Sequence, residues 1–215
     1  WYEGEETDGY LVRDGKTEYK ILVPATLTEF ITHAKDELTK FFAEATGITL
    51  VAVASAEPGG KYISLGDTDA FAASGISVDK SALGRDGLRI VSRGDSIYIV
   101  GGSDRGVLYG VYDFLKLNFG YEAYYKDCYT LDTGVKNVKF RNYNVTDVPD
   151  VAYRSRAGIL FNSTQENDDV MFAYRMRALD SLEEMLLPIH SKMGDSASAS
   201  NKTHNSAYYI PSSEY

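Results

Sequence analysis

Cysteine and histidine are scarce in this sequence, and their scarcity limits the chemistry open to it. Among 215 residues there is one cysteine, Cys128, so neither an internal disulfide framework nor a CxxC metal site is possible. We expect Cys128 to be a small, buried apolar side chain. His33, His190 and His204 form no HExxH motif and no pair at metal-ligand spacing. The sequence therefore predicts neither a zinc site nor a bound cofactor.

Runs of basic residues and long apolar runs are also missing. The chain has 22 basic and 31 acidic residues, a formal net charge of -9, and no cluster of lysine or arginine. This balance argues against nucleic acid or an anionic membrane surface as a partner, whereas a neutral ligand is easier to accommodate. No apolar stretch reaches the roughly 18 to 20 residues that cross a bilayer, so no membrane-spanning segment is predicted.

The sequence does contain enough apolar residues to form a substantial core. Hydrophobic residues make up 44% of the chain and aromatic residues 13%, which suits one domain with a smaller piece left over. The first nine residues are polar and acidic, and we expect residues 1–9 to form a tether. Asp14-Gly15 separates two strand-like segments, residues 10–13 and 17–23, and this dipeptide is typical of a β-hairpin turn.

Two amphipathic helices are predicted, and several short strands lie between them in the sequence. The first follows Thr26-Leu27-Thr28-Glu29, which has capping-box spacing, and ends at Gly47. Its apolar residues recur at helical spacing at Leu27, Phe30, Ile31, Ala34, Leu38, Phe41, Phe42 and Ala45. The second helix is expected over residues 103–118, ahead of Gly120.

The predicted strands complete one α/β sandwich. They cover residues 49–54, 62–65, 87–92, 96–100, 121–125 and 135–140. The strand over residues 49–54 is rich in β-branched residues and is expected to be buried. Strands 87–92 and 96–100 are expected to form a hairpin around Arg93-Gly94-Asp95. With two main helices packed on one mixed sheet, the fold class is α/β (α+β), spanning residues 10–145.

A boundary is predicted near residues 142–150. Beyond Pro149, a strand over residues 151–161, a helix from about residue 167 to 179 and a polar loop over residues 191–203 are too little for an independent core. We therefore expect this part either to pack against the first domain or to be the beginning of a larger domain.

Two turn motifs each admit a structural and a functional interpretation. Gly101 to Gly106 joins a strand to a helix N-terminus, where a phosphate could bind, but neither a GxGxxG nor a P-loop pattern is met. The alternative is that the glycines make the turn and Ser103 caps the helix. Arg93-Gly94-Asp95 spells a tripeptide that integrins recognise, although Gly-Asp is also an ordinary turn sequence.

Several polar residues are candidates for binding. Arg154 and Arg156 alternate along one predicted strand and could reach one pocket or form salt bridges. His204 and Asn205 lie among tyrosines, and a sugar site requires such aromatic faces beside polar hydrogen-bonding groups. The alternative is that this polar segment is a solvated loop. The remaining patterns are the acidic pairs Asp168-Asp169 and Glu183-Glu184, which read as exposed charge, and the glycosylation sequons at Asn144, Asn162 and Asn201.

The motif with the most specific likeness runs from Ile97 to Leu115, IYIVGGSDRGVLYGVYDFL. It resembles the strand–glycine–helix signature of the non-catalytic domain before the barrel of family 20 β-N-acetylhexosaminidases and family 67 α-glucuronidases. The upstream sequence from Asp86 to Ile90 and the strand–Pro–helix pattern of residues 19–47 are similar to the same domain. The likeness covers about residues 10–160.

The resemblance implies an accessory domain over residues 10–145 and the start of a truncated (β/α) TIM barrel over residues 146–215. It implies a secreted bacterial glycoside hydrolase, extracellular or at the cell surface and free or lipid-anchored, that acts on glycans or oligosaccharides. Its partners would be a carbohydrate ligand and the rest of the barrel in the same protein. Because the acid/base carboxylates of such barrels lie on later strands, the fragment itself is expected to be inactive and no catalytic residue is assigned.

The resemblance also suggests three substrate-binding residues. Tyr153-Arg154 is similar to the start of a Tyr-Arg-Gly substrate contact in family 20, with Ser155 in place of the glycine. His204-Asn205 looks like a later barrel loop. Arg154, His204 and Asn205 are therefore the predicted substrate-binding set. A carbohydrate-binding module without catalysis and a purely structural domain are the alternatives.

Overall fold

The computed structural model describes residues 4–125, 128–151, 154 and 173–177. The chain divides into two compact units, Trp1–Asp150 and Val151–Tyr215. In the second unit, residues 173–175 are helical, and the Arg177 amide donates to the Tyr174 carbonyl at 3.0 Å. Most of the predicted strand over 151–161 and of the helix over 167–179 lies outside the described residues, as does the loop over 191–203.

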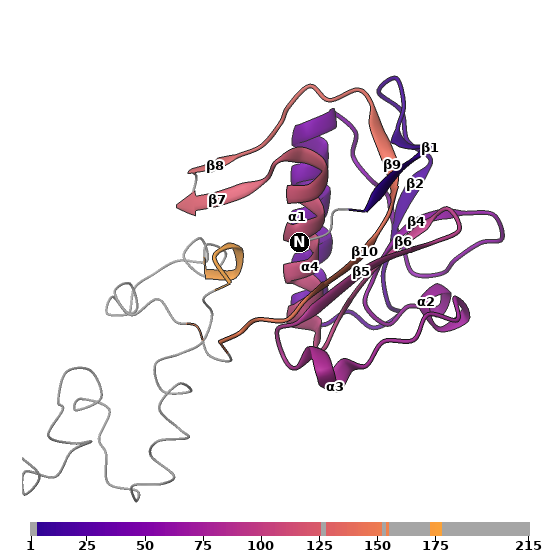
Figure 1. Ribbon diagram of the computed structural model, residues 1–215. Coiled ribbons are helices and arrows are strands. Elements are labelled where there is room, and N and C mark those ends of the chain that lie inside the picture. The colour runs from indigo at the N-terminus through magenta and orange to yellow at the C-terminus, as the bar shows by residue number, and fades with distance from the viewer. Residues whose placement is uncertain (1–3, 126–127, 152–153, 155–172, 178–215) are drawn as a thin grey trace, which may run out of the picture. The chain divides into compact units, whose positions relative to one another are not determined.

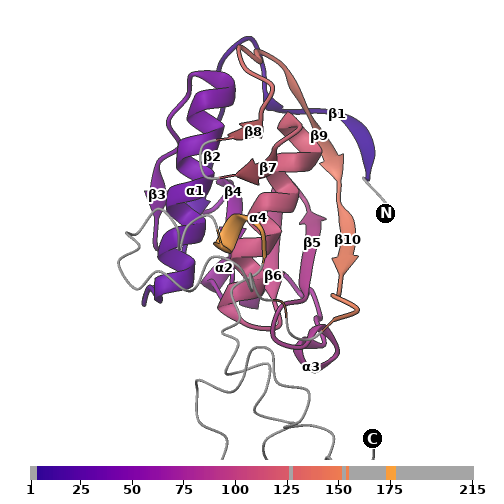
Figure 2. The same ribbon diagram turned by 90° about the vertical axis from the view of Figure 1, so that its left-hand side faces the viewer.

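The first unit is a mixed sheet with its two longest helices on one face (Figures 1 and 2). In chain order the elements are β1 (Glu5–Val12), β2 (Tyr19–Leu22), α1 (Glu29–Thr46), β3 (Ala52–Val53), β4 (Lys61–Leu65), α2 (Asp69–Ala73), α3 (Lys80–Leu83), β5 (Leu88–Arg93), β6 (Ser96–Gly101), α4 (Asp104–Phe119), β7 (Glu122–Tyr125), β8 (Cys128–Thr130), β9 (Val138–Asn142) and β10 (Asn144–Asp147). This arrangement confirms the predicted fold class of a mixed sheet with two main helices.

The main sheet has the strand order β10-β5-β6-β4-β2-β3. Strands β6, β4, β2 and β3 pair in parallel, whereas β5 pairs antiparallel with both β6 and β10. The parallel part places Ile21, Ile63 and Ile97 in one row across β2, β4 and β6, and all three are fully buried. Since a strand alternates its side chains, this row lies on one face of the sheet.

Helices α1 and α4 cover that face. An added Cβ on Gly110 of α4 would meet Ile99 Cγ2 at 2.5 Å, which places this helix directly on the row of β6 side chains. Each helix ends at a glycine in the left-handed region, Gly47 with φ 77° and Gly120 with φ 62°, as the sequence predicts.

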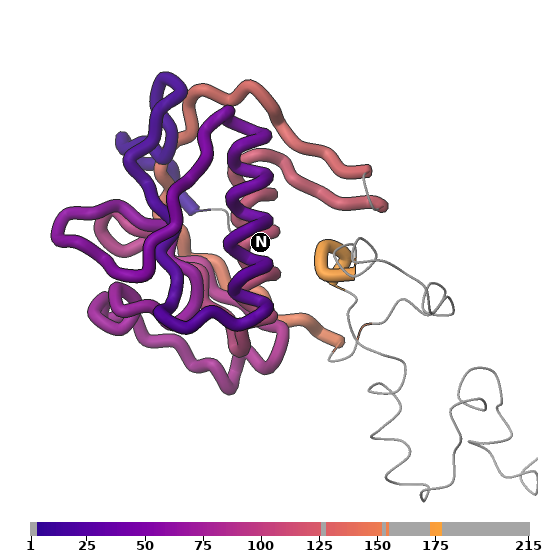
Figure 3. Tube along the Cα trace, turned by 180° about the vertical axis from the view of Figure 1, so that it is seen from behind, coloured from indigo at the N-terminus to yellow at the C-terminus, as the bar shows by residue number. Residues whose placement is uncertain are grey.

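The other face of the sheet is covered in part by short connecting segments. The ring of Tyr98 lies 6.2 Å from that of Phe71 in α2, and the Tyr62 hydroxyl accepts from the Glu57 amide at 2.8 Å. Seen from behind, the β7–β8 hairpin projects away from the sheet (Figure 3). An aromatic cluster anchors its base, since Phe41 of α1 lies 4.4 Å from Tyr121 and 5.2 Å from Tyr129 between ring centroids.

The predicted hairpin around Asp14-Gly15 is wrong, although its turn is present. Arg13 and Lys16 exchange two backbone hydrogen bonds of 2.9 Å, and Asp14 and Gly15 both have positive φ. Beyond this bridge the strands separate, because β2 pairs with β3 on one edge and β4 on the other and has no edge left for β1. Strand β1 pairs instead with β9, more than 120 residues later in the chain.

The predicted tether over residues 1–9 is wrong for residues 5–9, which form part of β1. Polar side chains do not prevent pairing, because the ladder uses backbone groups. The partners in β9 also suit them: Arg141 donates to a Glu6 carboxylate oxygen at 3.0 Å, and the Thr7 hydroxyl donates to the Phe140 carbonyl at 2.9 Å.

Three smaller predictions also differ from the structure. Thr28, not Thr26, caps α1, with its hydroxyl accepting from the Ile31 amide at 3.3 Å. The strand expected to be buried over residues 49–54 is reduced to β3, a two-residue strand at the edge of the sheet where Ala52 is exposed. Cys128, expected to be buried, is exposed because it lies in the projecting β7–β8 hairpin.

Candidate functional site

The predicted substrate-binding residues are not brought together by the described part of the chain. Arg154 is half-buried and belongs to the second unit. His204 and Asn205 lie outside the described residues, as do Arg156, the acidic pairs and the sequon at Asn162. The substrate-binding set therefore stays a prediction.

The glycine-rich turn at Gly101–Gly106 is built for close packing of backbone. An added Cβ on Gly102 would meet the Gly84 carbonyl oxygen at 1.7 Å, and one on Gly106 would meet the Gly87 carbonyl oxygen at 2.3 Å. Ser103 caps α4 by accepting from the Arg105 amide at 3.2 Å and donates to the Arg85 carbonyl at 2.7 Å. The strand–loop–helix junction is thus filled by residues 84–87, which favours the structural interpretation of this motif over phosphate binding.

A buried ion pair joins the two parts of the sequence motif. The Arg105 guanidinium donates to both carboxylate oxygens of Asp86, at 2.8 and 3.0 Å, and the two residues are only 8% and 7% exposed. Arg85 approaches the same carboxylate at 2.9 Å from a more exposed position. Bidentate, charge-assisted pairs of this kind are among the strong side-chain hydrogen bonds in proteins. It ties the α4 N-terminus to the start of β5, so its role is to hold the junction.

The Arg93-Gly94-Asp95 tripeptide closes the β5–β6 hairpin, as predicted. Arg93 pairs with Ser96 across the turn, and all three tripeptide residues are exposed. The charge of Asp95 also acts on Lys61 of the neighbouring strand β4. The tripeptide therefore belongs to a tight turn beside the groove described next.

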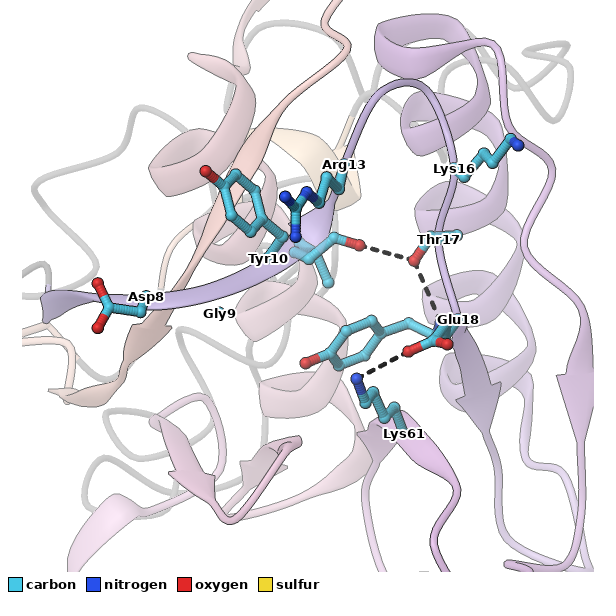
Figure 4. A pocket seen from close by; sticks show the side chains of 10 residues that line it. Asp8, Gly9, Tyr10, Arg13, Lys16, Thr17, Glu18 and Lys61 are labelled. Atoms are coloured by element: carbon cyan, nitrogen blue, oxygen red, sulfur yellow. Dashed lines mark hydrogen bonds and ion pairs between the residues drawn. The ribbon is translucent and has the colours of Figure 1, made fainter.

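A groove of about 580 Å³ lies between β1, the turn that follows it, and the beginnings of β2 and β4. Its lining residues are Asp8, Gly9, Tyr10, Leu11, Arg13, Lys16, Thr17, Glu18, Tyr19 and Lys61. Figure 4 shows Tyr10 and Arg13 on one side of the groove and Glu18 with Lys61 on the other. Its volume falls within the range of roughly 300–1,000 Å³ that small-ligand pockets occupy.

Ion pairing decides the charge states on the β2–β4 side of the groove. The Lys61 ammonium donates to a Glu18 carboxylate oxygen at 2.7 Å. This hydrogen bond, reinforced by the positive charge of Lys61, lowers the pKa of Glu18. The same hydrogen bond raises the pKa of Lys61, and the charges of Glu18 and Asp95 add to the effect. Both groups therefore remain charged at neutral pH.

The opposite side of the groove is organised around one aromatic ring. The Lys139 ammonium lies 4.1 Å and the Arg13 guanidinium 5.1 Å from the centroid of Tyr10, distances at which cations are attracted to a ring. The floor is set by Thr17, whose hydroxyl donates to the Leu11 carbonyl at 2.7 Å and accepts from the Tyr19 amide at 3.1 Å.

Neither a metal site nor a membrane helix is found in the part of the chain that the structure describes. Within those ranges, no three His, Cys, Asp or Glu side chains gather closely enough to hold a metal ion. No described helix combines the length and apolar character needed to cross a membrane.

The sequence did not identify the groove. Its residues come from β1, the turn, β2 and β4, and only the unexpected pairing of β1 with β9 places Tyr10 beside Lys139. The signal that could have found it is the local density of charged and aromatic residues over residues 8–19.

Two solved structures are similar to this chain, and the likeness to the first, with a TM-score above 0.5, supports the fold. A family 115 4-O-methyl-α-glucuronidase with specificity for decorated arabinogalactans is 12% identical with a TM-score of 0.52, covering 80% of this chain and 25% of that one. A family 20 β-N-acetylhexosaminidase from Streptomyces coelicolor A3(2) is 18% identical with a TM-score of 0.46, covering 71% of this chain and 26% of that one. The chain thus spans about a quarter of the length of these two proteins.

A family model places the chain more specifically. No curated protein matches the sequence. The model described as "Glycosyl hydrolase family 67 N-terminus" matches residues 7–114, which include most of β1, all of α1, α4 up to Phe114, and the junction held by Asp86 and Arg105. This match covers half of the chain and confirms the resemblance seen in the sequence. The chain therefore belongs to the glycosyl hydrolase family 67 N-terminus family.

Proposed function

We propose that this chain is a non-catalytic accessory domain of a glycoside hydrolase that acts on glycans or oligosaccharides, with the catalytic residues in another part of the same protein. Membership of a family defined by the N-terminal part of glycosyl hydrolases supports this proposal. The second unit, residues 151–215, would then begin the catalytic (β/α) barrel, and Arg154, His204 and Asn205 would contact substrate there.

The single observation that carries the non-catalytic assignment is the match of residues 7–114 to the N-terminal family, and the arrangement of the groove carboxylates agrees with it. Glycosidases generally need two carboxyl groups facing each other across the scissile bond, one of which stays protonated to act as the acid. The groove has Asp8 and Glu18, but ion pairing lowers the pKa of Glu18, which is the opposite of what an acid catalyst needs. Asp8 points away from Glu18 at the far end of the groove (Figure 4).

The experiment compares the 215-residue chain with the protein extended along its reading frame. Both are incubated with a panel of 4-nitrophenyl glycosides and with reduced oligosaccharides, and released product is measured. We expect no turnover by the 215-residue chain and turnover by the extended protein on at least one substrate. Hydrolysis by the short chain that disappears in Glu18→Gln would overturn the proposal, as would an extended protein inactive on every substrate.

We also propose that the protein is bacterial and acts outside the cell or at its surface. The resemblance to secreted bacterial glycosidases that the sequence shows supports this location. Fractionation of the producing organism, with antibody against residues 4–150, should detect the protein in the medium or the cell-surface fraction. Detection only in the cytosol would contradict it.

A further inference from the structure

The groove described above is lined by charges of both signs that nearly cancel. Among its lining residues three are basic and two are acidic, and one pair of them, Lys61 and Glu18, is neutralised by a direct hydrogen bond of 2.7 Å. Asp14, at 4.0 Å, also partly offsets the charge of Arg13. A strongly charged ligand would therefore find only a weak net field in the groove.

The same side chains offer an alternation of strong hydrogen-bond donors and acceptors. Arg13 and Lys61 donate, whereas Asp8 and Glu18 accept, and Figure 4 shows them distributed on different sides and at one end of the groove. A sugar hydroxyl both donates and accepts, so a sugar chain is suited to a lining of this kind. Hydrogen bonds to charged groups are also about twice as strong as those between neutral groups.

Tyr10 gives the groove an aromatic surface in a fixed position. Arg13 and Lys139 both contact its ring, and its backbone pairs with Lys139 in the β1–β9 ribbon. Binding then requires little loss of conformational freedom at this side chain. On the other side Tyr19 is also fixed, because it is buried and its ring stacks on Phe140 at 6.1 Å.

From this lining we propose that the groove between β1, β2 and β4 binds a neutral oligosaccharide, separately from any catalytic site. The inference rests on the proposed function, because membership of a glycosyl hydrolase family makes a glycan the expected ligand class. It goes further by assigning a binding site to the accessory domain itself. The domain would thus hold the enzyme on its polymeric substrate.

The test uses the 215-residue chain and direct binding, so it does not depend on hydrolysis. Calorimetric titration is carried out with neutral tetra- to hexasaccharides from cellulose, xylan, mannan and chitin, and with oligogalacturonates as the anionic arm. We expect at least one neutral series to bind and the oligogalacturonates to bind at least tenfold more weakly or not at all. Tighter binding of the anionic series, or no binding of any neutral one, would overturn the inference.

Matched variants locate the site. Arg13→Ala changes a residue whose side chain is 72% exposed, so folding should be preserved, and Tyr10→Ala removes the ring. Each should weaken binding by at least about tenfold, while Tyr125→Ala, which removes an exposed tyrosine on the β7–β8 hairpin, should leave it unchanged. Unchanged binding in a folded Arg13→Ala chain would exclude the groove. The turnover assays of the extended protein do not depend on this binding experiment. Failure of the proposed accessory role can therefore be distinguished from failure of glycan binding in the groove.

Discussion

At the scale of single residues, the family motif is explained by Asp86 and Arg105. Both lie in the stretch of sequence that carries the resemblance, and both are almost fully buried in one bidentate ion pair. A buried charge is tolerated only with a partner, so neither residue can change alone without cost. The motif is therefore a folding element at the junction of β5, β6 and α4.

Replacing Asp86 with asparagine should strongly destabilise the domain. The substitution leaves the buried Arg105 guanidinium without its carboxylate, and breaking such a pair costs about 3–5 kcal/mol. Urea unfolding followed by circular dichroism measures the change. The control is Asp67→Asn, which breaks the exposed Lys80–Asp67 pair and should cost less than about 1 kcal/mol. Equal effects of the two variants would contradict the structural role of Asp86.

The hydroxyl of Tyr143 should make stability fall at high pH. Burial raises the pKa of Tyr143 above its ordinary value of 10.0, while its hydroxyl donates to Asn118 at 2.7 Å. Above pH 10 the unfolded chain loses this proton and the folded chain keeps it, so the free energy of unfolding falls as pH rises. Below pH 10 this contribution to stability is fully present.

Tyr143→Phe tests this linkage. At pH 8 the variant should be less stable than the parent by about 1 kcal/mol, because it loses one hydrogen bond. At pH 11 the difference should shrink or reverse, since phenylalanine cannot ionise. Urea midpoints measured from pH 8 to pH 11 give the two curves, and Tyr125→Phe, at an exposed position, is the control that should follow the parent. If the urea midpoints of Tyr143→Phe and of the parent protein fell in parallel from pH 8 to pH 11, the predicted effect of Tyr143 ionisation on stability would be wrong.

At the scale of elements, the start of α1 shows how a sequence rule can select the wrong residue. Thr26 and Glu29 have capping-box spacing, yet Thr28 has the extended backbone of a cap, with ψ 169°. Its hydroxyl also donates to Asp104 at the start of α4, at 2.8 Å. This tertiary contact links the N-termini of the two main helices and cannot be read from local spacing.

Substituting the two threonines separately distinguishes the alternatives. Thr28→Ala should lower the free energy of unfolding by about 1–2 kcal/mol, the usual cost of losing a helix cap. Thr26→Ala, at an exposed position before the helix, should change it by less than about 0.5 kcal/mol. Thermal and urea unfolding of both variants measure these changes. A larger effect at Thr26 would show that the capping box forms in solution.

Two glycines of α4 should respond differently to substitution by alanine. At Gly106 the added Cβ would meet the Gly87 carbonyl oxygen at 2.3 Å, and backbone cannot move away easily. At Gly110 the clash is with Cγ2 of Ile99, at 2.5 Å, which is a side-chain atom rather than backbone. Alanine also favours helix over glycine by about 1 kcal/mol at both positions. We expect Gly106→Ala to be the more destabilising by at least about 1 kcal/mol in urea unfolding, and the reverse order would contradict this packing.

At the scale of the whole molecule, the described first unit has its own core. Its buried apolar side chains come from both helices and from all strands of the main sheet except the edge strand β3. A chain ending at Asp150 should therefore fold without the rest, retaining the far-ultraviolet circular dichroism of a mixed α/β protein and a single unfolding transition.

A shorter chain ending at Tyr143 provides the control for this prediction. It lacks β10, which pairs with β5 over four residues, and it exposes the edge of β5. We expect this shorter chain to unfold at least several degrees lower than the chain ending at Asp150 or to aggregate. A chain ending at Asp150 that shows no cooperative transition would contradict the independence of the first unit.

Local sequence signals were sufficient for elements whose partners are near in sequence. The β5–β6 hairpin, the Ser103 cap and the glycine ends of both helices were predicted because turn and cap chemistry acts over a few residues. The Asp14-Gly15 turn was predicted for the same reason, and its φ angles confirm it. The predicted strand pairing across that turn failed, because β2 is occupied on both edges by β3 and β4.

The two main helices, the mixed α/β class and the resemblance to a glycosyl hydrolase N-terminal domain could be predicted from the sequence, because helical periodicity and a local motif act over short stretches of chain. The pairing of β1 with β9, the buried contact between Asp86 and Arg105, and the groove lined by Tyr10, Arg13, Glu18 and Lys61 could not be predicted in this way. The physical reason is that each of these contacts joins segments from different elements, and which of them meet depends on how strand edges compete for partners, a property of the whole sheet.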